Sequence, residues 1–338
     1  MTLRTPTVAV LGGGTWGTTV ASLAARTTRT VLWVRDPEIA NAINVTHRNP
    51  RYLAGFDLAP ALRATADPAE AVADADVLIA AAPSQHLRGV LAAAADHVRP
   101  LIPVVSIAKG LEQGSGKRMT EVIADVLPGH PAGVLSGPNI AREVVQGYAA
   151  AATLAMPDHH TAQTLQGIFH NSRYRVYTSE DVLGVEIAGA LKNVFAIAVG
   201  FGDGLGAGDN TRAMVITRSL HEMTRLGVAL GGHAETLAGL AGMGDLIVTC
   251  ISPHSRNRHV GFELGRGRPL AEILAAMNQV AEGVKTTASV MKLAAERGIE
   301  IPIARDVDAV LNHGQPVEET YRGLLRVTPG HEVHGEAW

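Results

Sequence analysis

The chain has 338 residues, 46% hydrophobic and 18% charged, so it contains enough apolar material for two buried cores. Its 29 basic and 32 acidic side chains give a net charge of −3, which argues against the broad basic surface of a nucleic-acid-binding protein. The single cysteine excludes an internal disulfide and a Cys-x-x-Cys zinc site, and His159-His160 lacks the spacing of a metal pair. We therefore expect neither a nucleic-acid partner nor a metal.

The apolar segments are too short or too interrupted to span a membrane, which needs roughly 20 apolar residues. Nothing before the glycines at 12–14 resembles the apolar region of a signal peptide. The longest apolar stretch, 183–201, contains Glu186, Lys192 and Asn193. We expect a cytoplasmic protein without membrane insertion.

Short apolar runs alternate with helical segments in the first half of the chain. Strands are predicted at residues 7–11, 30–34, 77–82, 103–108, 134–135, 149–156 and 175–177. Helices are predicted at 15–26, 69–73, 87–97, 117–127, 140–146 and 159–170. This alternation predicts parallel βαβ units in a doubly wound, Rossmann-type α/β sheet.

The second half of the chain shows helical patterns with almost no strand signal. Helices are predicted at 182–202, 210–227, 234–240, 259–264, 269–277, 285–297 and 305–311. We place a dinucleotide-binding domain at 1–185, an all-α substrate domain at 186–330 and a tail at 331–338. The Ala- and Gly-rich helical faces suit a twofold homodimer as well as an internal core.

A Gly-x-Gly-x-x-Gly motif lies between the first predicted strand and the first predicted helix. Gly12 would form the tight turn, Gly14 would admit a pyrophosphate, and Gly17 would let helix and strand pack closely. Thr15 and Trp16 begin the helix, whose N–H groups would bind phosphate. The context predicts a dinucleotide cofactor.

The end of the second predicted strand carries two side chains of opposite charge. Asp36 lies where a carboxylate would bind a ribose 2′-hydroxyl and favour NAD. Its neighbour Arg35 would hold a 2′-phosphate and favour NADP. The sequence does not choose between the two cofactors.

The segment 189–204, which includes Lys192 and Asn193, resembles the signature of NAD(P)-dependent glycerol-3-phosphate dehydrogenase in its bacterial single-enzyme form. Further segments agree with that family in order and spacing: 12–17, 82–84, 109–110, 136–138, 208–212, 239–246, 255–258 and 282–284. The resemblance implies a helical domain like that of 6-phosphogluconate dehydrogenase. It also implies reversible NAD(P)H-dependent reduction of dihydroxyacetone phosphate to sn-glycerol 3-phosphate for phospholipid synthesis.

Reduction of a ketone needs a proton donor at the developing alkoxide, and a lysine can fill this role. Lys192 lies in an apolar helix, where burial disfavours its charged form unless a carboxylate is near. We expect Asp245, in a Gly-Met-Gly-Asp turn, to be that partner. The resemblance makes Lys192 the catalytic acid or base and Asp245 a substrate-site residue. Asn193 is open between orienting a partner or the nicotinamide amide and satisfying the backbone.

Lys109 ends a predicted parallel strand, at the sheet edge where ligands bind. The resemblance places it in both the substrate and the cofactor site, and we include it among the catalytic candidates. Ser255, Arg256 and Asn257 together offer hydroxyl, guanidinium and amide donors for a dianionic phosphate. The resemblance assigns all three to the substrate phosphate and Arg256 also to the cofactor.

The resemblance carries Gly137 and Asn139 to the substrate site and Ala141, Val280 and Glu282 to the cofactor site. After Ser-Gly-Pro the family usually has Ser or Thr and then an aromatic residue or His, whereas this chain has Asn139 and Ile140. The departure leaves room for a paralogue that acts on another phosphorylated or phosphonate hydroxyketone.

Two other functional classes compete with this interpretation. A ketopantoate reductase or β-hydroxyacid dehydrogenase shares the Lys–Asn arrangement but lacks segments like 208–212 and 255–258. A dinucleotide sensor would bind cofactor without turnover, which the retained Lys192, Asp245 and Arg256 argue against. A sugar dehydrogenase would need a nucleophilic cysteine, whereas we expect Cys250 to be packed in the core.

Overall fold

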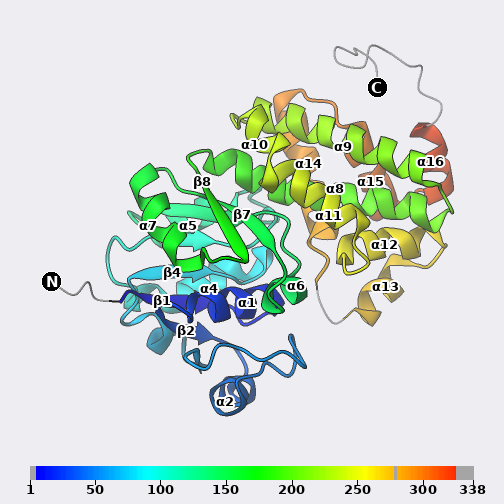
Figure 1. Cartoon of the computed structure of the whole chain (residues 1–338). Helices are drawn as coiled ribbons and strands as arrows, with labels where there is room; N and C mark the ends of the chain where they lie inside the picture. The colour runs from blue at the N-terminus through cyan, green and yellow to red at the C-terminus, as the bar shows by residue number, and fades with distance from the viewer. Residues whose placement is uncertain (1–4, 278–279, 325–338) are drawn as a thin grey trace. The chain divides into compact units, whose positions relative to one another are not determined.

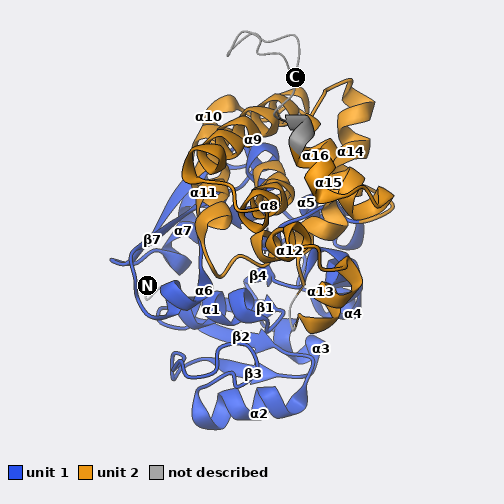
Figure 2. Ribbon diagram, turned by 90° about the vertical axis from the view of Figure 1, so that its right-hand side faces the viewer, with its two compact units in different colours: residues 1–112, 117–186 blue, residues 113–116, 187–338 orange. Residues whose placement is uncertain are grey.

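The computed structural model describes residues 5–277 and 280–324. Its contacts divide the chain into two compact units, shown in blue and orange in Figure 2. Unit 1 contains residues up to 112 together with 117–186, and unit 2 contains 113–116 and the residues from 187 onward. The expected tail at 331–338 lies outside the described residues.

Unit 1 is built on an eight-stranded sheet in the order β3-β2-β1-β4-β5-β6-β7-β8 (Figure 1). The strands are β1 Thr7–Leu11, β2 Arg29–Trp33, β3 Arg63–Thr65, β4 Val77–Ala80, β5 Val104–Ser106, β6 Ala132–Ser136, β7 Ala150–Ala155 and β8 Tyr174–Ser179. The strand order reverses between β1 and β4: β2 and β3 lie on one side of β1, and the later strands lie on the other. At this junction Val8 pairs with Val77 and Val10 with Ile79. This is the strand order of a dinucleotide-binding fold, so the predicted Rossmann-type class is confirmed.

Helices cover both faces of this sheet, because alternate residues of its central strand belong to two separate cores. Val8 and Val10 of β1 pack in one apolar cluster, whereas Ala9 and Leu11 pack in another. The helices of unit 1 are α1 Thr15–Ala24, α2 Pro37–Thr46, α3 Pro68–Val72, α4 Leu87–Ala94, α5 Met119–Val126, α6 Ala141–Val145 and α7 His159–Phe169, with short 3₁₀ turns η1 Ser84–His86 and η2 Ala95–His97.

Two features of the sheet differ from the sequence expectation. β7 runs antiparallel to β6, although alternating strands and helices predicted parallel units. The connection between them contains α6, whose five residues are too few to cross the face of a sheet, so the chain turns back at one end. The edge strand β3, Arg-Ala-Thr, was not predicted because it lacks an apolar run.

Among its described residues, unit 2 forms helices joined by turns and loops, and no strand. Its helices are α8 Val182–Gly204, which starts within unit 1, α9 Asp209–Ala229, α10 Ala234–Ala238, α11 Asp245–Ile251, α12 Arg256–Gly265, α13 Leu270–Ala276, α14 Glu282–Arg297, α15 Pro302–His313 and α16 Val317–Leu324, with a π-helical turn η3 at Leu240–Gly244. The predicted all-α second half is thereby confirmed. Helices α12, α14 and α15 each begin about a turn before their predicted starts. The first turn of α12, Arg-Asn-Arg, is polar and carries no apolar periodicity, whereas α15 begins at Pro302, a residue favoured at the first position of a helix.

Among the described residues, two helical runs are long and apolar enough to cross a membrane by length and composition. They are Val182–Gly204 and Ala234–Ile251, and 89% of the apolar window of the first is buried inside the protein. A core helix of a water-soluble protein has the same composition, so these runs are weak evidence for a membrane span.

Candidate active site

The glycine-rich turn between β1 and α1 has the backbone geometry of a phosphate-binding loop. Gly12 has a φ of +133°, and a Cβ there would lie 2.7 Å from the backbone of Ala81. A Cβ on Gly17 would lie 2.0 Å from the carbonyl oxygen of Gly12, so helix and strand are in direct contact. A Cβ on Gly14 would meet nothing within 4 Å.

Gly14 therefore borders open space at the start of α1. It is the N-cap residue and has no side chain to accept hydrogen bonds from the first N–H groups of the helix. Those groups remain for an anionic ligand, so the residues present fit a pyrophosphate. Thr15 and Trp16 form the first turn of α1, and the Trp16 ring packs 6.4 Å from the ring of Tyr174.

The two side chains expected to choose the cofactor lie at the end of β2. Asp36 is the N-cap of α2, and its Oδ1 accepts a 3.0 Å hydrogen bond from the backbone N–H of Glu38. Arg35 is exposed. Asp36 therefore has a local structural role in addition to any role with a ribose, and the cofactor preference stays open.

The carboxyl ends of β5 and β6 bring together two of the predicted site residues. Lys109 Nζ donates a 3.1 Å hydrogen bond to the carbonyl oxygen of Gly137. Gly137 has a φ of +152°, and a Cβ there would lie 2.9 Å from the backbone of Ala151 and Ala152. Asn139 follows two residues later, and among the described residues its buried Oδ1 has no hydrogen-bond partner. Ala141 is the first residue of α6.

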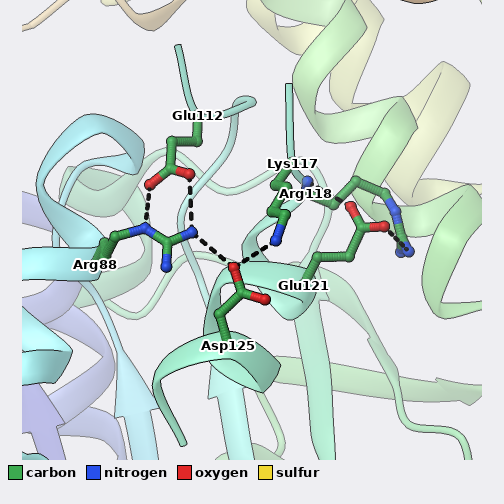
Figure 3. A network of polar contacts seen from close by, with 6 residues as sticks. All are labelled: Arg88, Glu112, Lys117, Arg118, Glu121 and Asp125. Atoms are coloured by element: carbon green, nitrogen blue, oxygen red, sulfur yellow. Dashed lines mark hydrogen bonds and ion pairs between the residues drawn. The ribbon is translucent and has the colours of Figure 1, made fainter. Parts of the chain in front are cut away.

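The loop that follows Lys109 is closed by a network of ion pairs at the protein surface (Figure 3). Arg88 binds both carboxylate oxygens of Glu112, at 2.8 and 3.0 Å, and also Asp125 at 2.9 Å. Lys117 Nζ lies 2.5 Å from the same Asp125 carboxylate. The backbone N–H of Glu112 donates to the carbonyl of Lys117, so the network joins the two ends of the segment 113–116.

Unit 2 contains a buried ion pair between Lys192 of α8 and Asp245 at the start of α11. Their side chains are 7% and 1% exposed, and Lys192 Nζ lies 2.5 Å from Asp245 Oδ1. The partner expected for Lys192 is thus the one the structure shows. Thr249, one helical turn after Asp245, accepts a 2.7 Å hydrogen bond from the same ammonium.

Thr249 was missed by the sequence reasoning, although its position carried a usable signal. Residues four apart on a helix share a face, so Thr249 had to lie beside Asp245 once a helix began there. Its hydroxyl donates to the carbonyl oxygen of Asp245 at 2.6 Å and accepts from Lys192. The hydroxyl therefore fixes the ammonium from a second side.

Asn193 points to a different set of partners from its neighbour Lys192. Its Oδ1 accepts a 2.9 Å hydrogen bond from Asn257 Nδ2, and Asn257 Oδ1 accepts one from the backbone N–H of Gly283. Both asparagines are buried. Its Nδ2 also donates a 3.4 Å hydrogen bond to the carbonyl oxygen of Gly189. Asn193 thus contacts both a side-chain partner and the backbone, and a contact with the nicotinamide amide stays a prediction.

The predicted phosphate-binding residues begin helix α12. Ser255 is its N-cap, and its hydroxyl accepts a hydrogen bond from the N–H of Arg258. Arg256 is exposed, close enough to Glu282 for their charges to interact. Val280 is 37% exposed and directly follows residues outside the described part of the chain. The ligand roles of these residues stay predictions.

Cys250 lies in the core, as expected from its apolar surroundings. Burial raises the pKa of its thiol to about 12, so it is protonated at neutral pH. A buried, protonated thiol is a poor nucleophile, which removes the basis for a sugar dehydrogenase. Among residues 5–277 and 280–324, no cluster of His, Cys, Asp and Glu could hold a metal ion.

Comparisons with known proteins agree over both halves of the chain. Residues 7–162 match the model for the N-terminus of NAD-dependent glycerol-3-phosphate dehydrogenase, and residues 181–322 match the model for its C-terminus. A Mycobacterium avium protein is 61% identical over 99% of both chains, and its name is glycerol-3-phosphate dehydrogenase with NAD(P)+ as the cofactor. The glycerol-3-phosphate dehydrogenase of Thermobifida fusca is 49% identical over 97% of this chain and 99% of its own.

Solved structures give the same result. The crystal structure of the Coxiella burnetii glycerol-3-phosphate dehydrogenase has a TM-score of 0.91 at 34% identity, covering 95% of this chain and 99% of that one. A ketopantoate reductase from Ralstonia eutropha, with a TM-score of 0.57 at 17% identity over 93% of this chain and 99% of its own, shares the fold alone. The chain belongs to the NAD-dependent glycerol-3-phosphate dehydrogenase family.

Proposed function

We propose that the chain catalyses the reversible NAD(P)H-dependent reduction of dihydroxyacetone phosphate to sn-glycerol 3-phosphate, which supplies glycerophospholipid synthesis. The bound cofactor supplies a hydride to the carbonyl carbon of the substrate. The residues of the chain must then hold the substrate, exclude water and provide a proton for the carbonyl oxygen.

The buried pair of Lys192 and Asp245 is the observation that carries this proposal. A lysine ammonium is stable in a buried site only with an opposite charge and hydrogen-bond acceptors around it. Asp245 and Thr249 supply both and fix the position of Nζ. Lys192 is therefore assigned as the group that donates its proton to the developing alkoxide, and in the reverse direction removes it from the hydroxyl. Asp245 and Thr249 orient the ammonium.

The phosphate of the substrate is assigned to the start of α12. Among the described residues, Arg256 makes no ion pair within 4 Å, whereas Arg258 in the same turn is bound to Asp203. A guanidinium matches the geometry of a phosphate, and the positive end of a helix adds to the attraction. Ser255 and Asn257 are assigned to the same phosphate. The hydroxyl of Ser255 also caps α12 by accepting the hydrogen bond from Arg258.

The cofactor is assigned to unit 1 through the turn at Gly12, Gly14 and Gly17 and the end of β2. Lys109, Gly137 and Asn139 are assigned to the substrate, and Ala141, Val280 and Glu282 to the cofactor. Arg35 and Asp36 leave NADH and NADPH as alternatives. On this assignment unit 1 corresponds to the cofactor-binding domain, 1–185, and unit 2 to the substrate domain, 186–330.

The decisive experiment measures NADH and NADPH oxidation by absorbance with dihydroxyacetone phosphate and with unphosphorylated dihydroxyacetone. We expect turnover with a strong preference for the phosphorylated ketone, and the two cofactor rates decide between Arg35 and Asp36. Cofactor binding without turnover on either ketone would contradict the proposal. It would direct attention to Asn139 and Ile140 and to another phosphorylated or phosphonate hydroxyketone.

The assembly and location of the protein also remain proposals. We propose a cytoplasmic homodimer, supported by the Ala- and Gly-rich helices of unit 2. Light scattering during gel filtration would test the dimer, and a mass of one chain at micromolar concentration would contradict it.

A further inference from the structure

Helices α8 and α12 touch each other through four glycines. Gly200 and Gly204 lie four residues apart on α8, and Gly261 and Gly265 four residues apart on α12, so each pair forms one face. A Cβ on Gly261 would lie 2.1 Å from the carbonyl oxygen of Ile197. A Cβ on Gly200 would lie 2.3 Å from that of Arg258. The backbones of the two helices are therefore in direct contact.

An ion pair joins the same two helices beside this contact. Asp203 of α8 has a side chain that is 4% exposed, and its Oδ2 accepts a 2.6 Å hydrogen bond from Nε of Arg258 in α12. Its other oxygen accepts a 2.8 Å hydrogen bond from Nε of Arg212 in α9. Asp203 thus binds two arginines, of which Arg258 alone lies on α12.

A third link connects the helices next to Lys192 and Arg256. Asn193, the residue after Lys192, accepts the hydrogen bond from Asn257, the residue after Arg256. The start of α12 is therefore fixed to α8 by a glycine contact, an ion pair and an amide bridge. Because Lys192 belongs to α8, these links also fix the distance between Lys192 and the start of α12.

We propose that Asp203 and Arg258 are positioning residues that hold Arg256 where it receives the substrate phosphate. This rests on the proposed function, in which Arg256 binds that phosphate. Of the two arginines in the first turn of α12, Arg258 is held by the carboxylate of α8 and Arg256 is left for the ligand. Substrate specificity then depends on a residue that does not touch the substrate.

The test compares Arg258→Gln with Arg212→Gln, because each removes one arginine from the same carboxylate. The readout is the ratio of kcat/KM for dihydroxyacetone phosphate to kcat/KM for dihydroxyacetone, together with the inhibition constant of inorganic phosphate. In Arg258→Gln we expect the ratio to fall about tenfold and phosphate to inhibit about tenfold more weakly, the size expected when a charged hydrogen bond is loosened. In Arg212→Gln both should stay within about twofold of wild type, because Arg212 lies on α9 and Arg258 still holds Asp203.

Activity on dihydroxyacetone, which has no phosphate, should fall no more in Arg258→Gln than in Arg212→Gln. Equal losses on both ketones would show a merely structural role and overturn the proposal. If Arg258→Gln does not fold, Arg258→Lys takes its place, because it keeps a charge opposite Asp203 but loses the Nε contact. It should show the same loss of phosphate discrimination, and an unchanged ratio would contradict the proposal.

The wild-type ratio distinguishes a failure of the proposed function from a failure of the positioning role. A wild-type enzyme without preference for the phosphorylated ketone would contradict the proposed function itself. A wild-type enzyme with that preference, retained in full by Arg258→Gln, would contradict the positioning role alone.

Discussion

Each unit of the molecule contains a lysine–aspartate pair of the same length in a different environment. In unit 1, Lys117 lies 2.5 Å from Asp125, with side chains 41% and 35% exposed (Figure 3). In unit 2, Lys192 lies 2.5 Å from Asp245, with side chains 7% and 1% exposed. Distance alone does not tell the two pairs apart, whereas burial does.

The difference in burial predicts different functions for the two pairs. Water screens the exposed pair, and Arg88 shares its carboxylate, so each single contact contributes little. The buried charges are shielded from water, and the removal of one takes the opposite charge away from the other inside the core. The exposed network around Asp125 therefore closes a loop in unit 1. The buried pair in unit 2 holds the charged Lys192 ammonium away from water.

The largest expected effect on stability comes from Asp245→Ala. It leaves the Lys192 ammonium buried without its carboxylate, and we expect the free energy of unfolding to fall by about 3–5 kcal/mol. Urea denaturation followed by circular dichroism measures it. The matched variant is Asp125→Ala in unit 1, which should unfold at nearly the wild-type urea concentration. Equal losses in the two variants would show that burial does not separate the pairs.

The buried carboxyl of Glu222 in unit 2 predicts a pH dependence of stability. It accepts hydrogen bonds from the N–H groups of Ile303 and Ala304 at the start of α15. Burial raises its pKa to about 7, against those hydrogen bonds and Arg225. The folded state therefore holds the proton to a higher pH than the unfolded state, so this stabilisation is present at low pH and is lost as pH rises through 7.

The free energy of unfolding should fall by roughly 3 kcal/mol between about pH 5 and pH 8 because of Glu222, and Glu222→Gln should lack this contribution. Urea denaturation at the two pH values measures it. Asp306, whose pKa burial raises to about 6, changes stability in the same direction and remains in the variant. A pH dependence that is identical in wild type and Glu222→Gln would contradict the assignment.

A glycine-to-alanine change should have opposite signs in the two units. Gly261→Ala places a methyl group against the backbone of α8, and we expect a loss of about 1–3 kcal/mol. Gly167 is exposed in α7, where a Cβ would meet nothing within 4 Å. Gly167→Ala should raise the free energy of unfolding by up to about 1 kcal/mol. Thermal unfolding of both variants checks the signs, and destabilisation by Gly167→Ala would refute the comparison.

The smallest expected effect is that of Arg88→Gln in the exposed network. We expect a loss of less than about 1 kcal/mol at low salt that shrinks as salt is added, because solvent ions screen exposed pairs. Thermal unfolding across a salt series measures it. A large loss that salt does not change would mean that this network behaves like the buried pair.

The parts of the fold predicted from sequence are those with local signals. β1 and β4 are short, mostly apolar runs. The Gly-x-Gly-x-x-Gly spacing at 12–17 is typical of the turn that follows the first strand of a dinucleotide-binding fold. β3 and the direction of β7 were not predicted, because a polar edge strand has no apolar pattern and an apolar run carries no strand direction. Helix α2 was missed despite Asp36 and Pro37, a standard start signal.

The candidate site follows the same division. Lys192 was identified because a lysine in an apolar helix needs a partner, and Asp245 because a tight Gly-Met-Gly-Asp turn was expected to present it. The structure instead forms a π-helical turn there and begins α11 at Asp245. The hydrogen bond between Asn193 and Asn257 was not predicted, because no local pattern marks it and it joins residues 64 positions apart. The ion pair between Arg258 and Asp203 was also not predicted, because the two residues lie on different helices and no motif links them.

The most direct test of the central claim compares Lys192→Met with Lys117→Met. Each removes a lysine that lies 2.5 Å from an aspartate. With dihydroxyacetone phosphate and NADH or NADPH, kcat of Lys192→Met should fall by about 100-fold or more, while cofactor binding measured by fluorescence stays intact. Lys117→Met should keep kcat near the wild-type value. A Lys192→Met protein that is folded, binds cofactor and turns over at the wild-type rate would contradict the account.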